Sequence, residues 1–156
     1  MPDAPLCDAL REKILEQIER TAHLIALLPE TRLDWTPSPG AWTVRELIGH
    51  LLDCISGFCA VLAAAEPDRL AHFAKLRQVP GTIEIYRNHI EQGFAVLTDA
   101  DLARRVPTVF VSQGETVLTL FLGNLEHLIN HKHQLFSYLK QMDVLVATPD
   151  LYRFRG

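Results

Sequence analysis

Two histidines four residues apart, His127 and His131, are the clearest candidates for chemistry in this sequence. Residues at positions i and i+4 of an α-helix project from the same face, so two imidazole rings at this spacing can bind one metal ion. The spacing is weak evidence by itself, because a chain with seven histidines often contains such a pair by chance. The residues around the pair must therefore decide the interpretation.

A band of uncharged polar side chains runs alongside this pair. At about 100° per residue, Asn124, Gln134 and Tyr138 fall within one narrow band with the two histidines. A solvated helix face would normally carry Lys and Glu, and this band carries neither. We therefore expect the band to line a cavity, in which Asn124, Gln134 and Tyr138 support the metal ligands or orient a substrate.

A tight site of this type needs a third ligand from another segment, and His50 is the natural candidate. Asp53 follows three residues later and could accept a ring N–H from a ligating histidine, although an ordinary surface aspartate is the alternative. Cys54 is a rival ligand, but a free cysteine more often packs as a small hydrophobic residue. The other histidines need no metal: we expect surface positions for His23, His72 and His133, and a packed, hydrogen-bonded ring for His89.

Three neutral imidazoles would leave a divalent ion with open coordination positions, as is typical of catalytic rather than structural sites. Such an ion makes water or a thiol nucleophilic near neutral pH. Zinc, nickel, iron and copper all accept imidazole ligands, and the spacing does not choose among them. No general base can be identified. We expect a metal-dependent transferase or hydrolase of a small molecule; the alternatives are a non-catalytic metal-binding module for stress response or assembly, and histidines that merely pack.

Four segments with helical periodicity must position these side chains, and they cover residues 3–28, 43–65, 82–97 and 115–141. The second begins with a capping box, in which Thr43 and Glu46 exchange side-chain and backbone hydrogen bonds. Residues 66–81 and 99–114 form long connections, the first with a short helical piece near 70–76. Residues 106–111 are β-like in composition but too few to predict a sheet. We expect an extended tail over residues 144–156 and one all-α four-helix bundle domain over residues 1–156.

The composition excludes several classes of partner. The formal net charge is −4, and no run of Lys and Arg is present, so neither nucleic acid nor an anionic membrane surface is an expected partner. The N-terminus does not resemble a secretory signal, and the most apolar stretch, residues 55–65, is too short to span a bilayer. Three cysteines do not make a disulfide framework. We expect a cytoplasmic protein that acts on a small molecule.

Two segments together resemble the DinB/YfiT-like metalloenzyme family. The first is WTPSPGAWTVRELIGHLLD, residues 35–53, and the second is EHLINHKHQLFSYLK, residues 126–140. The resemblance extends in order and spacing over nearly the whole chain. It implies a four-helix bundle with one divalent metal held by His50, His127 and His131, and it implies frequent dimers. Some relatives are transferases or isomerases that use low-molecular-weight thiols.

The chain departs from the family pattern at two places. Lys132-His133 stands where Arg-Gly usually follows the second histidine of the last helix, which leaves the ligands intact but puts any role of that arginine in doubt. Asp143 replaces the glycine that commonly ends this helix, which affects only how the chain leaves it.

Overall fold

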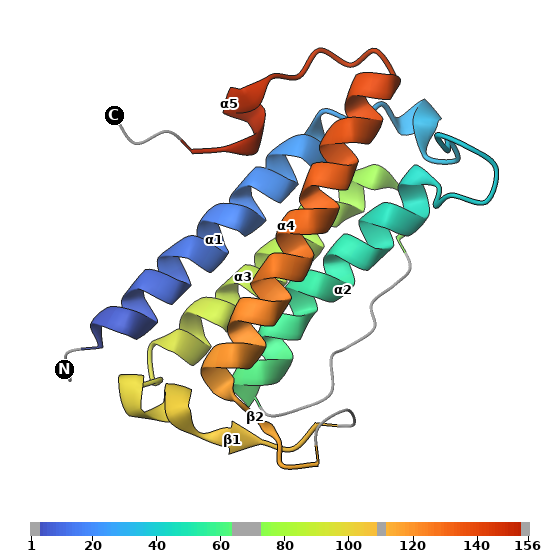
Figure 1. The fold of residues 1–156 in the computed structure, drawn as a ribbon. Coiled ribbons are helices and arrows are strands. Elements are labelled where there is room, and N and C mark those ends of the chain that lie inside the picture. The colour runs from blue at the N-terminus through green and yellow to red at the C-terminus, as the bar shows by residue number, and fades with distance from the viewer. Residues whose placement is uncertain (1–3, 64–72, 109–111, 154–156) are drawn as a thin grey trace.

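Four long helices form the body of the computed structural model, which describes residues 4–63, 73–108 and 112–153. Their bounds are α1 Pro5–Ala26, α2 Val44–Ala63, α3 Val79–Phe94 and α4 Val117–Gln141 (Figure 1). The prediction of an all-α four-helix bundle is therefore confirmed.

The helices do not alternate simply in direction. α1 and α4 run one way along the bundle, and α2 and α3 run the other way (Figure 1). A long connection between α2 and α3 is therefore required, because parallel helices cannot be joined by a tight turn. Each of α1 and α2 packs against both α3 and α4. As a result α2 and α4, which carry the candidate ligands, are antiparallel neighbours.

Shorter elements occupy the connections. They are three short 3-10 helices, η1 Glu30–Arg32, η2 Leu76–Gln78 and η3 Asp99–Ala103, the antiparallel strands β1 Arg105–Val106 and β2 Glu115–Thr116, and the helix α5 Thr148–Leu151. The short helical piece expected near residues 70–76 falls partly outside the described residues, as do residues 109–111 of the β-like stretch. The expectation of a wholly extended tail is wrong, because α5 lies within it.

The helix starts follow local hydrogen bonding. The backbone N–H of Thr43 donates to the Glu46 carboxylate (2.7 Å), and the N–H of Glu46 donates to the Thr43 hydroxyl (3.2 Å), so the predicted capping box is present. α3 begins three residues before the predicted start. Pro80 lies in its first turn, where a missing N–H costs nothing.

α2 is the most apolar of the four long helices. Its buried side chains face both α3 and α4, among them Leu47, Leu51 and Phe58. By length and composition alone this helix could cross a membrane, but half of the relevant window is buried inside the bundle. Burial against neighbouring helices accounts for its apolar character.

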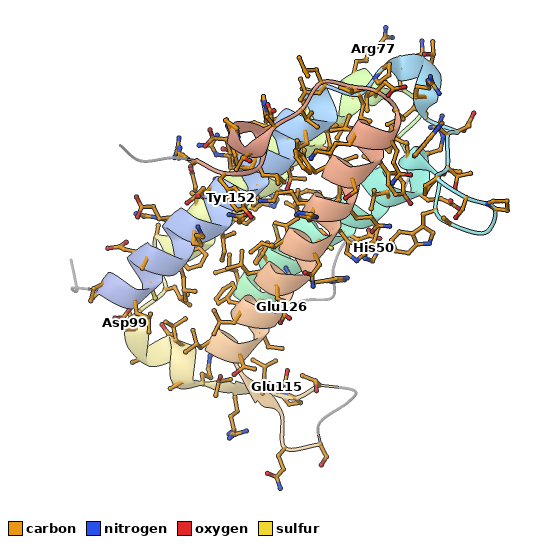
Figure 2. The ribbon with its side chains drawn as sticks, turned by 45° about the horizontal axis from the view of Figure 1, so that its top comes forward. His50, Arg77, Asp99, Glu115, Glu126 and Tyr152 are labelled. Carbon is orange, nitrogen blue, oxygen red and sulfur yellow. The ribbon has the colours of Figure 1, made fainter. Side chains whose placement is uncertain are left out.

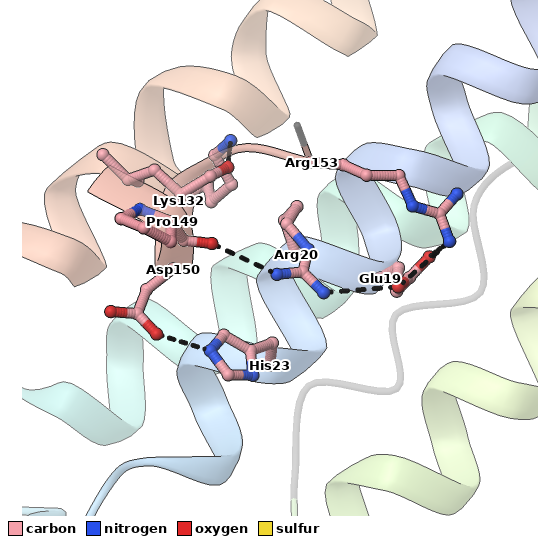
Figure 3. A network of polar contacts seen from close by, with 8 residues as sticks. Glu19, Arg20, His23, Lys132, Pro149, Asp150 and Arg153 are labelled. Carbon is pink, nitrogen blue, oxygen red and sulfur yellow. Dashed lines mark hydrogen bonds and ion pairs between the residues drawn. The ribbon is translucent and has the colours of Figure 1, made fainter. Parts of the chain in front are cut away.

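A buried lysine on α4 anchors the C-terminal segment. Lys132 is only 2% exposed, and its Nζ donates to Gln17 Oε1 on α1 (2.7 Å) and to the backbone carbonyl of Leu151 (2.9 Å). Burial lowers the pKa of this ammonium group to about 8. Beside it, His23 on α1 hydrogen-bonds Asp150 (2.8 Å; Figure 3). These contacts fasten α5 across α1 and α4.

The last helix ends in a left-handed residue that is not glycine. Asp143 adopts a left-handed conformation, with φ of 61°. The N–H of Val144 donates to the carbonyl of Leu139 (2.9 Å), which satisfies one of the free carbonyls of the last turn. Asp is one of the few residues other than glycine that adopts this conformation readily.

The first helix is capped from a distant segment. Ala4 precedes α1 and offers no side-chain acceptor. Instead, the Asp99 carboxylate accepts from the N–H groups of Cys7 (2.9 Å) and Leu6 (3.1 Å). The N–H of Cys7, followed by that of Leu6, lowers the pKa of the Asp99 carboxyl.

Replacing Asp99 with Ala is expected to lower the Tm at neutral pH, because two N–H groups of α1 lose their acceptor. The folded pKa of Asp99 lies below its unfolded value of about 3.9. The stabilisation is therefore complete above that value and is lost as pH falls through the folded pKa. Thermal melts followed by circular dichroism should show a Tm difference that narrows below about pH 4.

Asp34→Ala is the matched control, since the Asp34 side chain is 91% exposed and should change the Tm little. An Asp99→Ala protein with the wild-type Tm at neutral pH would contradict this account of the cap.

Candidate metal centre

Three imidazole rings from two helices converge on one point. His50 comes from α2, and His127 and His131 come from α4; one nitrogen of each ring lies within 4.8 Å of the other two. His50 lies on the flank of α2 next to α4 (Figure 2). The ring centroids are 4.4 Å apart for His50 and His131, 4.9 Å for His50 and His127, and 4.8 Å for the pair on α4.

A hydrogen bond between α4 and α2, here called the polar clamp, holds the two helices close together beside these rings. The Asn124 side chain, one turn before His127, donates from Nδ2 to the backbone carbonyl of Cys54 (2.8 Å). Gly57 makes room for this amide, because a Cβ atom added there would lie 3.0 Å from Asn124 Oδ1. The clamp therefore fixes the distance between the two helices where the histidines meet.

The spacing of the His50 and His127 nitrogens suits a shared divalent ion. His50 Nε2 and His127 Nε2 are 3.0 Å apart. Two nitrogens that share an ion at roughly 2.0–2.1 Å lie roughly 2.9–3.4 Å apart for common coordination angles. Burial lowers the pKa of both rings, and the neighbouring His131 lowers them further. The two rings are thus held neutral near pH 7, the form that can bind a metal.

A chain of hydrogen bonds orients the ring of His131. The Tyr138 hydroxyl must donate to the carbonyl of Trp42 (3.0 Å), because a carbonyl can only accept. The Tyr138 oxygen then accepts from Gln134 Nε2 (3.4 Å), so Gln134 Oε1 faces His131 Nδ1 (2.8 Å). His131 must donate from Nδ1 to that oxygen. In the neutral ring this tautomer leaves Nε2 without a proton and available to a metal.

The residue that sequence reasoning missed is Trp42. Its ring lies over the site, with centroids 4.7 Å from that of His50 and 5.5 Å from that of His131. Trp42 directly precedes the N-cap of α2, and the path of the loop brings it over the histidines. No spacing rule in the sequence could place it there, because its position depends on the tertiary contact of Tyr138 with the loop.

Cys54 lies outside the ligand cluster. Its Sγ is 3.7 Å from His127 Nδ1, on the side of the ring away from the nitrogen that faces His50. Burial, and then the charge of Asp53, raise the pKa of the Cys54 thiol to about 12. A neutral thiol that packs behind His127 fits this position better than a thiolate ligand.

Asp53 lies near His50 but faces a cavity. Among the described residues its carboxylate makes no hydrogen bond to a histidine, although its charge partly offsets the lowering of the His50 pKa. Asp53 and His50 both line a cavity of about 410 Å³ on the outer side of α2. His127 is exposed, so the cluster can be reached from solvent.

The other histidines lie away from this cluster. His23 pairs with Asp150, and His133 is exposed, with its ring 5.8 Å from that of Phe136. The expectation of a packed ring for His89 is wrong, because His89 is exposed on α3. His72 lies outside the described residues.

Comparisons with known proteins agree with this fold. The model of the DinB superfamily matches residues 14–135. A DinB-like protein from Bacillus cereus superposes with a TM-score of 0.77 at 14% identity, over 90% of this chain and 95% of that chain. A DinB-like protein from Bacillus subtilis gives 0.73 at 20% identity, over 94% of this chain and 96% of that chain. No curated protein sequence matches the chain.

Replacing Tyr138 with Phe is expected to loosen the loop over the site. The carbonyl of Trp42 and the amide of Gln134 each lose a partner, at a cost of about 0.5–1.5 kcal/mol in the free energy of unfolding. Urea denaturation measures that cost. In a Trp35→Phe background, where Trp42 is the only tryptophan, acrylamide should quench the fluorescence more strongly in the Tyr138→Phe protein.

Tyr152→Phe, the same chemical change on the C-terminal segment, is the control and should leave quenching unchanged. Equal quenching in all three proteins would show that Tyr138 does not hold the loop.

Proposed function

Because the chain belongs to the DinB superfamily, we propose that it is a metal-dependent transferase or hydrolase of a small molecule. His50, His127 and His131 are the proposed ligands of one divalent ion, zinc, nickel or iron. The observation that carries the proposal is the meeting of these three rings beside a cavity of about 410 Å³. A site with three protein ligands and adjoining space is the arrangement of a catalytic rather than a structural metal.

The bound ion would supply Lewis acidity, by which water or a thiol becomes nucleophilic near neutral pH. The residues of the chain prepare the site for it. Gln134 fixes the orientation of His131, and Trp42 shields one side of the rings from water. Asp53 and His50 line a cavity together with Trp42, and a substrate has room there. The exposed ring of His127 provides access from solvent.

A low-molecular-weight thiol is the proposed cosubstrate, in keeping with the resemblance to DinB/YfiT-like proteins. The accessible cluster and its cavity favour this function over a non-catalytic metal-binding module, which would need no space beside the ion. We also propose a homodimer, as that resemblance implies, and a cytoplasmic location. The free thiols of all three cysteines are in keeping with a reducing compartment.

Metal analysis tests the ligand assignment. Purified wild-type protein is expected to retain about one divalent ion per chain, and the His127→Ala/His131→Ala protein should retain almost none. A His89→Ala/His133→Ala protein is the matched control, since both of its altered residues are exposed histidines outside the cluster, and it should match the wild type. Equal metal content in the wild-type and His127→Ala/His131→Ala proteins would refute the assignment.

A reaction screen tests the catalytic part of the proposal. The metal-loaded protein is mixed with bacterial low-molecular-weight thiols and an electrophile, and loss of free thiol is followed with time. A parallel set of ester and amide substrates tests hydrolysis. Turnover should require the metal and fall at least about 100-fold in a His50→Ala protein. Metal binding without turnover in any of these reactions would reject the enzyme and leave the metal site standing.

A further inference from the structure

The cavity next to His50 has walls of two kinds. Trp42 and Phe73 give it an aromatic surface, and the charged residues Arg45, Glu46 and Asp53 give it polar groups. At about 410 Å³ it can hold a small organic molecule, whereas an ion alone would not need it. The three charged groups differ in how far they are available to a ligand.

The Glu46 and Arg45 side chains already have partners. The carboxylate of Glu46 accepts from both the backbone N–H and the hydroxyl of Thr43. The Arg45 guanidinium donates to the carbonyl of Phe73 (3.2 Å), lies over the Phe73 ring, and is 3.7 Å from the Asp34 carboxylate. Glu46 is thus held through Oε2 and Arg45 through Nη1, so both side chains are fixed in the cavity wall by contacts within the protein.

Asp53 differs from its neighbours. It is half-buried in the cavity wall, and its carboxylate makes no hydrogen bond or ion pair with any residue in the described part of the chain. A half-buried carboxylate gains most from a partner that brings both positive charge and N–H donors. The face of Trp42 also attracts cations through the negative potential of its π-system, whereas Phe73 already has the Arg45 guanidinium over its ring. An anion would instead meet two carboxylates, those of Glu46 and Asp53, against the single guanidinium of Arg45.

We infer that this cavity binds an organic ammonium ion with a flat apolar body, whose N–H groups meet Asp53 and whose body packs against Trp42 and Phe73. The inference rests on the proposed function, because it names the substrate class of the same site. Asp53 is one helical turn from His50, so the two Cβ atoms are about 5–6 Å apart. The ammonium group of the substrate therefore lies only a few bonds from its reacting atom.

Benzylamine, benzyl alcohol and benzoate are the probes for this inference. They share a ring and differ in charge at neutral pH, being cationic, neutral and anionic. Binding is measured by chemical-shift titration on the metal-free and the metal-loaded protein. Benzylamine should bind at least about 10-fold more tightly than benzyl alcohol in both forms, and benzoate should bind most weakly. The metal-free form excludes direct ligation of the amine by the ion.

The decisive variant is Asp53→Asn, which removes the charge and keeps the shape. It should weaken benzylamine about 10-fold and leave benzyl alcohol unchanged. Glu84→Gln removes an equal charge from an exposed position of α3 outside the cavity wall, and it should alter neither affinity. Unchanged thermal melts of both variants confirm that they are folded.

Four results would overturn the inference. The wild-type protein could bind benzylamine and benzyl alcohol equally, prefer benzoate, or bind none of the probes. The fourth is an Asp53→Asn protein that binds benzylamine as tightly as the wild type. Its failure is distinguishable from failure of the proposed function. Loss of amine selectivity with intact metal binding rejects the inference alone. A protein that binds no metal but selects the amine through Asp53 rejects the proposed function alone.

Discussion

The antiparallel contact between α2 and α4 is the constraint on which the site depends. Two of the candidate ligands belong to one helix, and the third reaches them only if the neighbouring helix is held at a fixed distance. Asn124 and Gly57 set that distance through a hydrogen bond to the backbone and the absence of a side chain opposite it. A side chain at position 57 would crowd the Asn124 amide and so disturb the helix contact near the rings, even though it touches none of them.

Orientation of the rings depends on a second link, between the helices and the loop that precedes α2. The hydrogen bonds from His131 through Gln134 and Tyr138 end on the backbone of Trp42. One chain of donors therefore determines both which nitrogen of the imidazole is free and where the aromatic cover lies. Because the capping box begins at the very next residue, the start of α2 and the cover over the histidines are positioned together.

Much of the fold followed from short-range rules, and the remainder depended on contacts between distant residues. Helical periodicity and the Thr43–Glu46 pair predicted the helices, and the i, i+4 histidines together with His50 predicted the cluster. The start of α3 was predicted too late, because a proline can either end a connection or occupy a first helical turn. Spacing along the chain could not reveal the cap that Asp99 gives to α1, since those residues are more than ninety positions apart. Nor could it show that His89 faces solvent, because its place at the edge of an apolar stripe fits either environment.

The buried lysine of α4, Lys132, limits which substitutions homologous sequences can accept. Lys132 is adjacent to His131 but lies on the side of α4 that faces α1, where Gln17 and the carbonyl of Leu151 are its partners. An apolar side chain at position 132 would leave the buried Gln17 side chain without its hydrogen-bond donor. Substitutions at positions 17 and 132 should therefore occur together during evolution. Covariation between positions 17 and 132 among homologues would then record the docking of the C-terminal segment, independently of selection on the histidines.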